Sequence, residues 1–300
     1  MNQTDLTDVA IVIVGWNACS YVRDCIESIY RARWNRTTFE IIYVDNGSAD
    51  GSVAMARDRF PNVRVIANDR NLGFCRAANQ GVRIASSRHL FFLNDDTIVE
   101  PDAIQLLVDF MQAHPEAGVV GARLLNPDLT DQWSGRRFPS PLNGVLGRRS
   151  RLSRLVPNAK PLTDYLYRDL VRKGDPFEAD WVSAAAVLVG KDTFEKVNGF
   201  AEDYYYWHEA VFCDRVRRAG KQVFLDPRSR IIHFEGKGSG ARPYKVQRWH
   251  IIDFHRGAYR CYCEHYACSV VNPARWLAGA ALGLRATALL VAARLTNQDS

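Results

Sequence analysis

The sequence predicts an α/β fold in which helices cover both faces of a doubly wound, mostly parallel sheet, followed by a C-terminal helical extension. Through residue 125, short apolar runs alternate with helical stretches over short loops, which is the pattern of a parallel sheet. These runs, such as the one from Val9 to Val14, are β-branched and uninterrupted, as are strands buried on both faces. Polar clusters follow three of the runs, at the carboxyl ends where such sheets bind ligands.

The first half divides into strands and helices in alternation. Polar turns separate the elements, and Pro101 suits the first turn of the last helix in this half. The predicted strands cover residues 9–14, 40–44, 63–67, 89–93 and 118–125, and the predicted helices cover 20–32, 51–60, 74–85 and 101–113.

The second half follows a basic stretch at 136–160, which we interpret as a surface connection or as a phosphate or anionic-membrane contact. The predicted strands then cover 181–189, 222–225 and 230–233, and the predicted helices cover 191–197, 210–219 and 245–270. In the apolar tail 276–295, Arg285 and Arg294 leave a longest uncharged run of nine residues. Because a bilayer span needs roughly 20 residues, we expect a helix docked on the domain or lying in a membrane interface.

The composition is that of an ordinary globular protein. Of 300 residues, 47% are hydrophobic and 24% are charged, which excludes a disordered or collagen-like chain. The net charge of +6 is too small to indicate a nucleic-acid partner, and we expect none. The seven cysteines include no C-x-x-C pair, which argues against structural zinc and suits a reducing compartment. No secretory signal is visible at the start, so we expect a cytoplasmic protein.

The polar clusters after the strands are candidate ligand sites. No glycine-rich dinucleotide motif or P-loop follows a strand, so a nucleotide must be held in another way. Asp45, in Asp45-Asn46-Gly47-Ser48, can accept a hydrogen bond from a nucleobase, or the cluster is only a turn. Asp95 and Asp96 follow a very apolar strand, and their carboxylates either bind Mg²⁺ or Mn²⁺ or belong to a polar loop.

Two residues of the second half are further candidates. His233 ends a short strand before a glycine-rich loop, where it is either a structural histidine or a ligand. Glu209 lies among aromatic residues just before a helix. A carboxylate at such a place is either a general base or a favourable charge at the helix N-terminus.

In combination, these motifs resemble the inverting glycosyltransferases of family 2, which have the GT-A fold, and in particular their rhamnosyltransferase-like branch. The matching segments run in order from Val9 to about His265. They are Trp16-Asn17, Val44 to Ser52, Asn71 to Phe74, Ala78 to Gly81, Leu93 to Asp96, Trp181 to Val189, Gly199-Phe200, residues 204–220, and His233 with Gly238-Ser239.

The resemblance implies a role for each matched residue. Glu209 takes the position of the catalytic base, and Asp96 with His233 takes the position of the metal ligands for Mg²⁺ or Mn²⁺. The implied nucleotide-binding residues are Asn17, Asp45, Asn71, Asn79, Asn94 and Asp95, and the implied acceptor-side residues are Trp181, Trp207 and His208. The family commonly has E-D-x-D-L-C-x-R where this chain has His208 to Arg215, so His208 and Val211 replace two usual acids.

The resemblance also implies a domain organisation and a reaction. We expect a nucleotide-sugar-binding half (1–125), a basic connecting segment (126–176), an acceptor-side half (177–243) and a C-terminal helical extension (244–300). The implied reaction moves a sugar, first of all rhamnose, from a dTDP- or UDP-sugar to a hydroxyl of a lipid-linked or cell-surface glycan. The implied location is the cytoplasm, with peripheral contact at the inner face of the plasma membrane.

Three other functions remain open from the sequence. An inactive scaffold or sugar-binding protein would explain the altered 208–211 segment. A nucleotidyltransferase would need a lysine-bearing glycine loop after the first strand, and no lysine occurs before Lys160. A processive synthase would have several spanning helices and a Q-x-x-R-W motif, which Gln247-Arg248-Trp249 lacks in its spacing.

Overall fold

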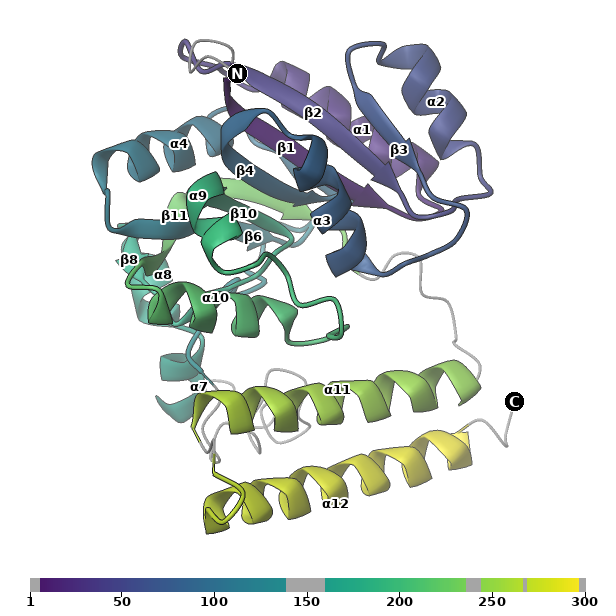
Figure 1. Cartoon of the computed structure of the whole chain (residues 1–300), viewed down its shortest axis with the longest axis vertical. Coiled ribbons are helices and arrows are strands. Elements are labelled where there is room, and N and C mark those ends of the chain that lie inside the picture. Colours follow the sequence, from purple (N-terminus) through teal and green to yellow (C-terminus); the bar gives the residue numbers. More distant parts are fainter. Residues whose placement is uncertain (1–5, 139–159, 236–243, 267–268, 297–300) are drawn as a thin grey trace.

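A computed structural model describes residues 6–138, 160–235, 244–266 and 269–296 (Figure 1). Its strands are β1 (Thr7–Gly15), β2 (Phe39–Asp45), β3 (Arg64–Ala67), β4 (Ser87–Asn94), β5 (Thr97–Val99), β6 (Ala117–Leu125), β7 (Gly135–Arg136), β8 (Phe177–Glu178), β9 (Trp181–Val182), β10 (Ala186–Gly190) and β11 (Gln222–His233). Its helices are α1 (Cys19–Arg31), α2 (Ser52–Arg59), α3 (Phe74–Ile84), α4 (Ala103–Ala113), α7 (Lys160–Tyr165), α8 (Arg168–Lys173), α9 (Lys191–Lys196), α10 (His208–Arg218), α11 (Tyr244–His265) and α12 (Pro273–Thr296).

The main sheet has the strand order β3-β2-β1-β4-β10-β6-β11-β5, with β8 paired to β11. The first four strands are parallel, β11 is parallel to β6, and β10 runs antiparallel between β4 and β6. The carboxyl ends of the first four strands are aligned, since Gly15 pairs with Asp45, Val14 with Asn94, and Asp45 with Ala67. The predicted polar clusters therefore meet at one edge of the sheet.

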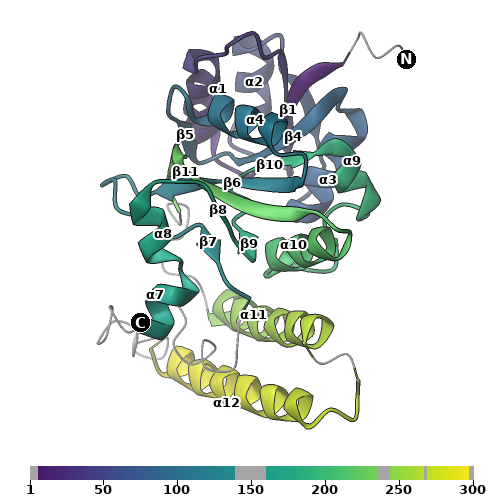
Figure 2. The same ribbon diagram turned by 90° about the vertical axis from the view of Figure 1, so that its left-hand side faces the viewer.

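Each face of the sheet carries its own hydrophobic core, as the alternation of side chains along a strand requires. Ile11, Ile13 and Phe91 pack with α1, α2 and α4, whereas Val12 and Phe92 pack with α3, α9 and α10. Figure 2 shows α1, α2 and α4 above the sheet and α10 below it. The predicted α/β fold, mostly parallel with helices on both faces and a C-terminal helical extension, is confirmed.

Two predicted strand boundaries are wrong. The predicted strand 181–189 is broken, because β9 pairs with β7 in a separate small sheet and only β10 joins the main one. Val182 lies so close to Gly121 of β6 that a Cβ on Gly121 would meet it at 2.7 Å. The predicted strands 222–225 and 230–233 form one strand, β11, whose register shifts between Asp226 and Arg230.

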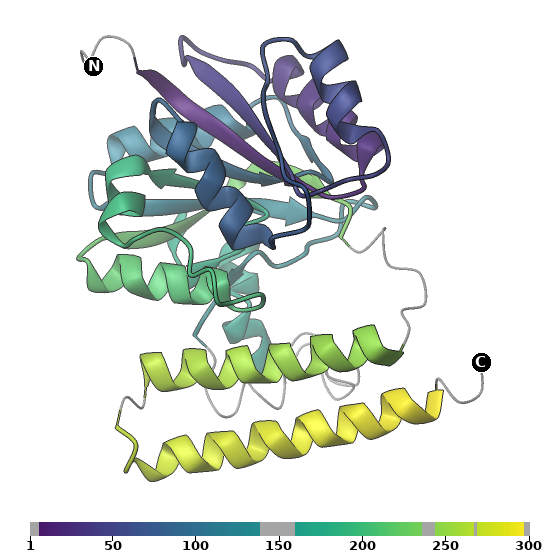
Figure 3. The same cartoon turned by 45° about the vertical axis from the view of Figure 1, so that its right-hand side comes forward.

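The C-terminal extension is a pair of helices, α11 and α12, that lie side by side below α10 in Figures 1 and 3. α11 contacts the domain through Phe254, whose backbone carbonyl accepts the Trp207 indole N–H at 3.1 Å, and α12 packs on the other side of α11. Among the described residues, Pro273–Arg294 is the one helix that is long and apolar enough to cross a membrane, by length and composition. Two predicted segments lie outside the described residues. They are most of the basic segment, at 139–159, and the glycine-rich loop at 236–240.

Candidate active site

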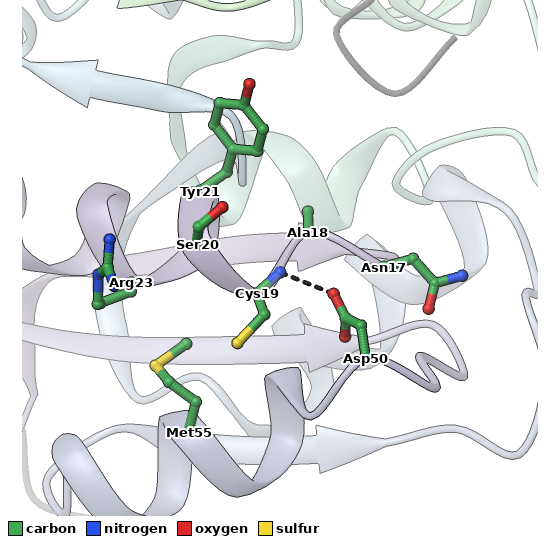
Figure 4. A pocket seen from close by; sticks show the side chains of 8 residues that line it. All are labelled: Asn17, Ala18, Cys19, Ser20, Tyr21, Arg23, Asp50 and Met55. Carbon is green, nitrogen blue, oxygen red and sulfur yellow. Dashed lines mark hydrogen bonds between the residues drawn. The ribbon is translucent and has the colours of Figure 1, made fainter. Parts of the chain in front are cut away.

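The loops that follow β1 and β2 are joined by hydrogen bonds. The backbone N–H of Asn17 donates to the Ser48 hydroxyl at 2.8 Å, and the Asn17 amide oxygen accepts the N–H of Ala49 at 2.8 Å. Asp50 accepts the N–H of Cys19 at 2.8 Å, beside an open pocket of about 440 Å³ (Figure 4). The exposed side chains of Trp16 and Asn17 thus sit on a fixed loop at the carboxyl edge.

Asp45 is the most enclosed of the predicted nucleotide-binding residues, with 1% of its surface exposed. One carboxylate oxygen accepts the Tyr43 hydroxyl at 2.9 Å, and the other accepts the N–H groups of Gly47 and Ser48 at 3.1 and 2.9 Å. Burial and the neighbouring Asp45 charge raise the pKa of Tyr43, so its hydroxyl stays a donor. Asp45 holds the turn in this conformation, and its contact with a nucleobase stays a prediction.

Asn94, Asp95 and Asp96 turn the chain from β4 into β5. Asp95 accepts the backbone N–H of Trp16 at 3.3 Å, which connects this turn to the loop after β1. Burial, with a smaller effect of the Asp96 charge, raises the pKa of Asp95 to about 7. A cation at this edge would favour the ionised form of Asp95.

His233 reaches the same turn although it lies far away in the sequence. β11 pairs antiparallel with β5, so that His233 lies opposite Thr97, and the N–H of Phe234 donates to the Asp96 carbonyl at 2.9 Å. The His233 Nε2 atom is 3.2 Å from Asp96 Oδ1 and 3.2 Å from Asn94 Nδ2. The structure therefore brings the two predicted metal ligands into contact.

Gln132 fixes the tautomer of His233. The Gln132 amide nitrogen donates to the His233 backbone carbonyl at 2.7 Å, which leaves the amide oxygen facing His233 Nδ1 at 2.8 Å. Because that oxygen can only accept, Nδ1 must carry the proton. Nε2 then presents its lone pair, and the Asn94 amide group donates to it. Gln132 itself is buried, with 5% of its surface exposed.

His233 Nε2 and Asp96 Oδ1 face one another at 3.2 Å. Asp96 Oδ1 is buried and has no hydrogen-bond partner among the described residues. An imidazole nitrogen and a carboxylate oxygen in this arrangement fit a divalent cation such as Mn²⁺ or Mg²⁺. No cluster of three or more His, Cys, Asp or Glu occurs in the part of the chain described.

Glu209 lies in the first turn of α10, at the same edge as the loop before α3. The ring of His208 packs on that of Phe74 at 5.1 Å, and Cys75 Sγ contacts the Tyr204 carbonyl at 3.5 Å, so the start of α10 faces the start of α3. The carboxylate of Glu209 is 3.6 Å from His208 Nδ1, and 22% of the side chain is exposed. Its carboxylate is reachable from solvent, as a base that takes a substrate proton must be.

The other predicted residues have mainly internal contacts. Asn79 uses its amide group to bind both the N–H and the carbonyl of Phe200, at 3.1 and 3.0 Å. Asn71 is exposed and caps the N–H of Gly73 at 2.9 Å. Trp181 is 4% exposed and donates to the Arg137 carbonyl at 2.9 Å, and Trp207 is tied to α11. Contacts of these four side chains with substrate stay predictions.

Sequence reasoning missed Gln132 and Tyr43. Gln132 follows no strand end and belongs to no motif, so no sequence signal could have selected it. Tyr43 stands two residues before Asp45 on the same side of β2, which is the spacing that a hydrogen bond along one strand face requires.

Solved structures similar to this one are GT-A glycosyltransferases. The structure of GalNAc-T7 with UDP, GalNAc and Mn²⁺ matches with a TM-score of 0.59 at 15% identity, over 86% of this chain and 48% of that chain. The present chain thus spans about half of GalNAc-T7. A mannosyltransferase from Pyrobaculum calidifontis in complex with GDP-Man and Mn²⁺ matches with a TM-score of 0.57 at 16% identity, over 99% and 81%. The protein has the GT-A fold.

The family model of glycosyl transferase family 2 matches residues 10–164, and the chain belongs to this family. It is a glycosyltransferase, as predicted. Over 257 residues it is 28% identical to N-acetylglucosaminyl-diphospho-decaprenol L-rhamnosyltransferase of Mycobacterium tuberculosis, covering 82% of this chain and 81% of the relative. An uncharacterized glycosyltransferase of Escherichia coli is 32% identical over 111 residues, covering 36% and 31%. The predicted resemblance to the rhamnosyltransferase-like branch is confirmed.

Proposed function

We propose that the protein is an inverting, metal-dependent glycosyltransferase that moves a sugar from a nucleoside-diphosphate sugar to a hydroxyl of a lipid-linked or cell-surface glycan. The observation that carries this proposal is the contact of His233 Nε2 with the buried Oδ1 of Asp96 at 3.2 Å, with Glu209 at the same edge of the sheet. Rhamnose from dTDP-rhamnose is the first choice of donor, and a UDP-hexose is the second. The mycobacterial relative supports both rhamnose and a polyprenyl-linked acceptor.

Asp96 and His233 would hold Mg²⁺ or Mn²⁺. When bound, the cation neutralises charge on the diphosphate of the donor. The chain itself prepares this place: Gln132 keeps the proton on His233 Nδ1, and the backbone of Phe234 holds Asp96 in register. Both ligands are therefore oriented before any ligand arrives, which reduces the entropy lost on binding.

Glu209 would take the proton from the acceptor hydroxyl as the hydroxyl oxygen attacks the anomeric carbon. The bond from that carbon to the diphosphate oxygen breaks in the same step, and the nucleoside diphosphate leaves with the bonding electrons. A single displacement of this kind inverts the anomeric configuration. The carboxylate stands in the first turn of α10, where a negative charge interacts favourably with the backbone N–H groups of the helix N-terminus. The rings of Phe74 and Phe200 pack on His208, which contacts Glu209 and limits where the carboxylate can swing.

On the donor side, Asn17, Asn94 and Asp95 offer polar groups along one edge, and Asn71 caps the loop that precedes α3. Asp45 would bind the nucleobase after its turn opens, because both of its oxygens are engaged. We place the enzyme in the cytoplasm, in peripheral contact with the inner face of the plasma membrane, where a polyprenyl-linked acceptor would be presented.

The test is transfer by the full chain with Mn²⁺, using dTDP-rhamnose and UDP-hexoses as donors and a polyprenyl-diphospho-N-acetylglucosamine as acceptor. NMR of the product should show an anomeric configuration opposite to that of the donor, and chelation of the metal should stop transfer. A product with the donor's configuration would contradict the single displacement.

An inactive scaffold is the second candidate, because His208 and Val211 stand where the family commonly has acids. Donor hydrolysis separates the two, since an active site transfers slowly to water when the acceptor is omitted. Donor binding without hydrolysis or transfer, over all nucleotide-sugars tried, would favour the scaffold.

A further inference from the structure

The outward face of α12 carries several large exposed apolar side chains. Leu277, Leu284 and Val291 are spaced by seven residues, which places them on one side of a helix, and they are 71%, 74% and 55% exposed. Trp276 is 66% exposed beside them, and Val271, before the helix, is 82% exposed. We name these five residues the apolar face. Folded soluble domains rarely leave large apolar side chains exposed in one row.

Two of the three arginines of α12, Arg275 and Arg285, turn away from this face, and Arg294 is exposed in the last turn of the helix. Arg275 donates from Nε to the hydroxyl of Tyr259 on α11 at 3.2 Å. Burial lowers the pKa of His255 on α11, and the Arg285 charge lowers it further. Arg285 therefore lies near that histidine. Arg275 and Arg285, which bound the longest uncharged run in the sequence, therefore lie on the α11 side of the helix.

α12 is tied to α11 along its length, and α11 is tied to the domain. Gly279 packs so closely on the ring of Tyr259 that a Cβ there would meet it at 3.2 Å. On the other side of α11, Arg260 pairs with Asp203, and Glu264 accepts the hydroxyl of Tyr204 at 2.7 Å. If α12 spanned a membrane, the charged helix α11 that is packed against it would be drawn into the hydrocarbon, which is unfavourable. The arrangement suits a helix that lies flat.

The positive net charge of α11 and α12 favours an anionic binding partner. Residues 244–296 contain seven Lys and Arg against two acidic residues. Like charges disfavour a second copy of the same surface, whereas anionic lipid headgroups complement it. Amphipathic helices with basic flanks and Trp or Leu on the apolar side bind at the lipid–water interface.

We propose that the apolar face of α12 docks the enzyme on an anionic membrane surface, with the helix in the plane of the interface and α11 between it and the domain. This surface gives the peripheral contact proposed above a defined location and orientation. Docking requires neither donor nor acceptor, so its test can fail or succeed independently of the glycosyltransferase reaction.

The experiment is flotation of the full chain with vesicles of equal parts phosphatidylcholine and phosphatidylglycerol, in the absence of nucleotide. Leu277→Glu/Leu284→Glu should lower the vesicle partition coefficient by about tenfold or more, because two charges then face the hydrocarbon. The matched control is Ala54→Glu/Arg57→Gln, which makes the same change in net charge on exposed positions of α2 and should retain binding within about twofold. Circular dichroism should show both variants folded.

Three results would overturn the proposal. The first is equal loss of binding in the two double variants, which would assign binding to net charge alone. The second is no binding by the unaltered protein. The third is a dimer in lipid-free solution that Leu277→Glu/Leu284→Glu dissociates without changing vesicle binding, which would assign the apolar face to a second copy. Weaker flotation with pure phosphatidylcholine is expected, and equal flotation would remove the anionic part of the proposal.

Discussion

Gln132 should control metal affinity without touching the metal, and Gln132→Leu tests this. The substitution keeps the approximate volume of a side chain that is 5% exposed and removes its hydrogen bonds to His233 Nδ1, to the His233 carbonyl and to Asn126. Each buried group left without a partner costs about 1–3 kcal/mol. His233 then no longer needs a proton on Nδ1, and the alternative tautomer would direct its Nε2 proton at Asp96.

The expected result is a decrease of about 10–100-fold in Mn²⁺ affinity, the range typical for groups that orient a metal-binding histidine. Affinity is measured by calorimetric titration of Mn²⁺ in the presence of a nucleoside diphosphate, and independently as the Mn²⁺ concentration for half-maximal transfer. Equal kcat at saturating Mn²⁺ would show that Gln132 acts through metal binding.

A matched control separates metal affinity from stability. Gln105 is similarly buried, at 7% exposure, and bonds to the N–H of Asn35 and to Asp109 in α4, away from the site. Gln105→Leu should lower the free energy of unfolding by a similar amount and leave Mn²⁺ affinity unchanged. Equal Mn²⁺ affinity in both variants and the unaltered protein would refute the role assigned to Gln132.

Three further predictions concern other parts of the molecule. Glu209→Gln should lower kcat by about 100-fold or more and leave donor affinity by calorimetry unchanged, and near-normal turnover would exclude Glu209 as the base. Gly81→Ala should lower the free energy of unfolding by about 1–3 kcal/mol in denaturant titration, since its Cβ would meet Val12 at 2.5 Å, and unchanged stability would show that α3 shifts freely. Burial raises the pKa of Cys25 to about 12. A thiol reagent at pH 8 should therefore label the partly exposed Cys19 and leave Cys25 unmodified, as measured by peptide mass mapping. Equal labelling of the two cysteines would contradict this prediction.

The sequence predicted most of the sheet because its signals are local. Runs such as Val9 to Val14 are buried on both faces whatever their neighbours are, so composition alone identifies them. The break between β9 and β10 was missed because Trp181 to Val189 is apolar throughout and its pairing depends on distant strands. The continuity of β11 was missed because a local signal misleads there. Pro227 suggests that the strand ends, whereas the strand continues and only shifts its register.

The candidate site was predictable in its members and not in its internal contacts. The meeting of Asp96 with His233 followed from the resemblance, because nothing in the spacing of 96 and 233 requires it. The bonds that engage Asp45 and Asn79 depend on side-chain orientation and on the path of loops that the sequence does not specify. Gln132 depends on tertiary structure in the same way, since its role exists only once β11 places His233 beside it.

The packing of α10 accounts for the two positions, 208 and 211, at which this chain lacks the acids common in the family. Val211 is 3% exposed and belongs to the core formed with α3 and α9, so an acid at this position would be buried among apolar side chains. Glu209 stands two positions earlier, on a side of the helix that solvent reaches. His208 in turn fills the space between Phe74 and Phe200 with its ring and keeps one nitrogen on the Tyr205 carbonyl. The residues that replace these two acids thus form an apolar and aromatic support beside Glu209, the carboxylate to which we assign the proton transfer.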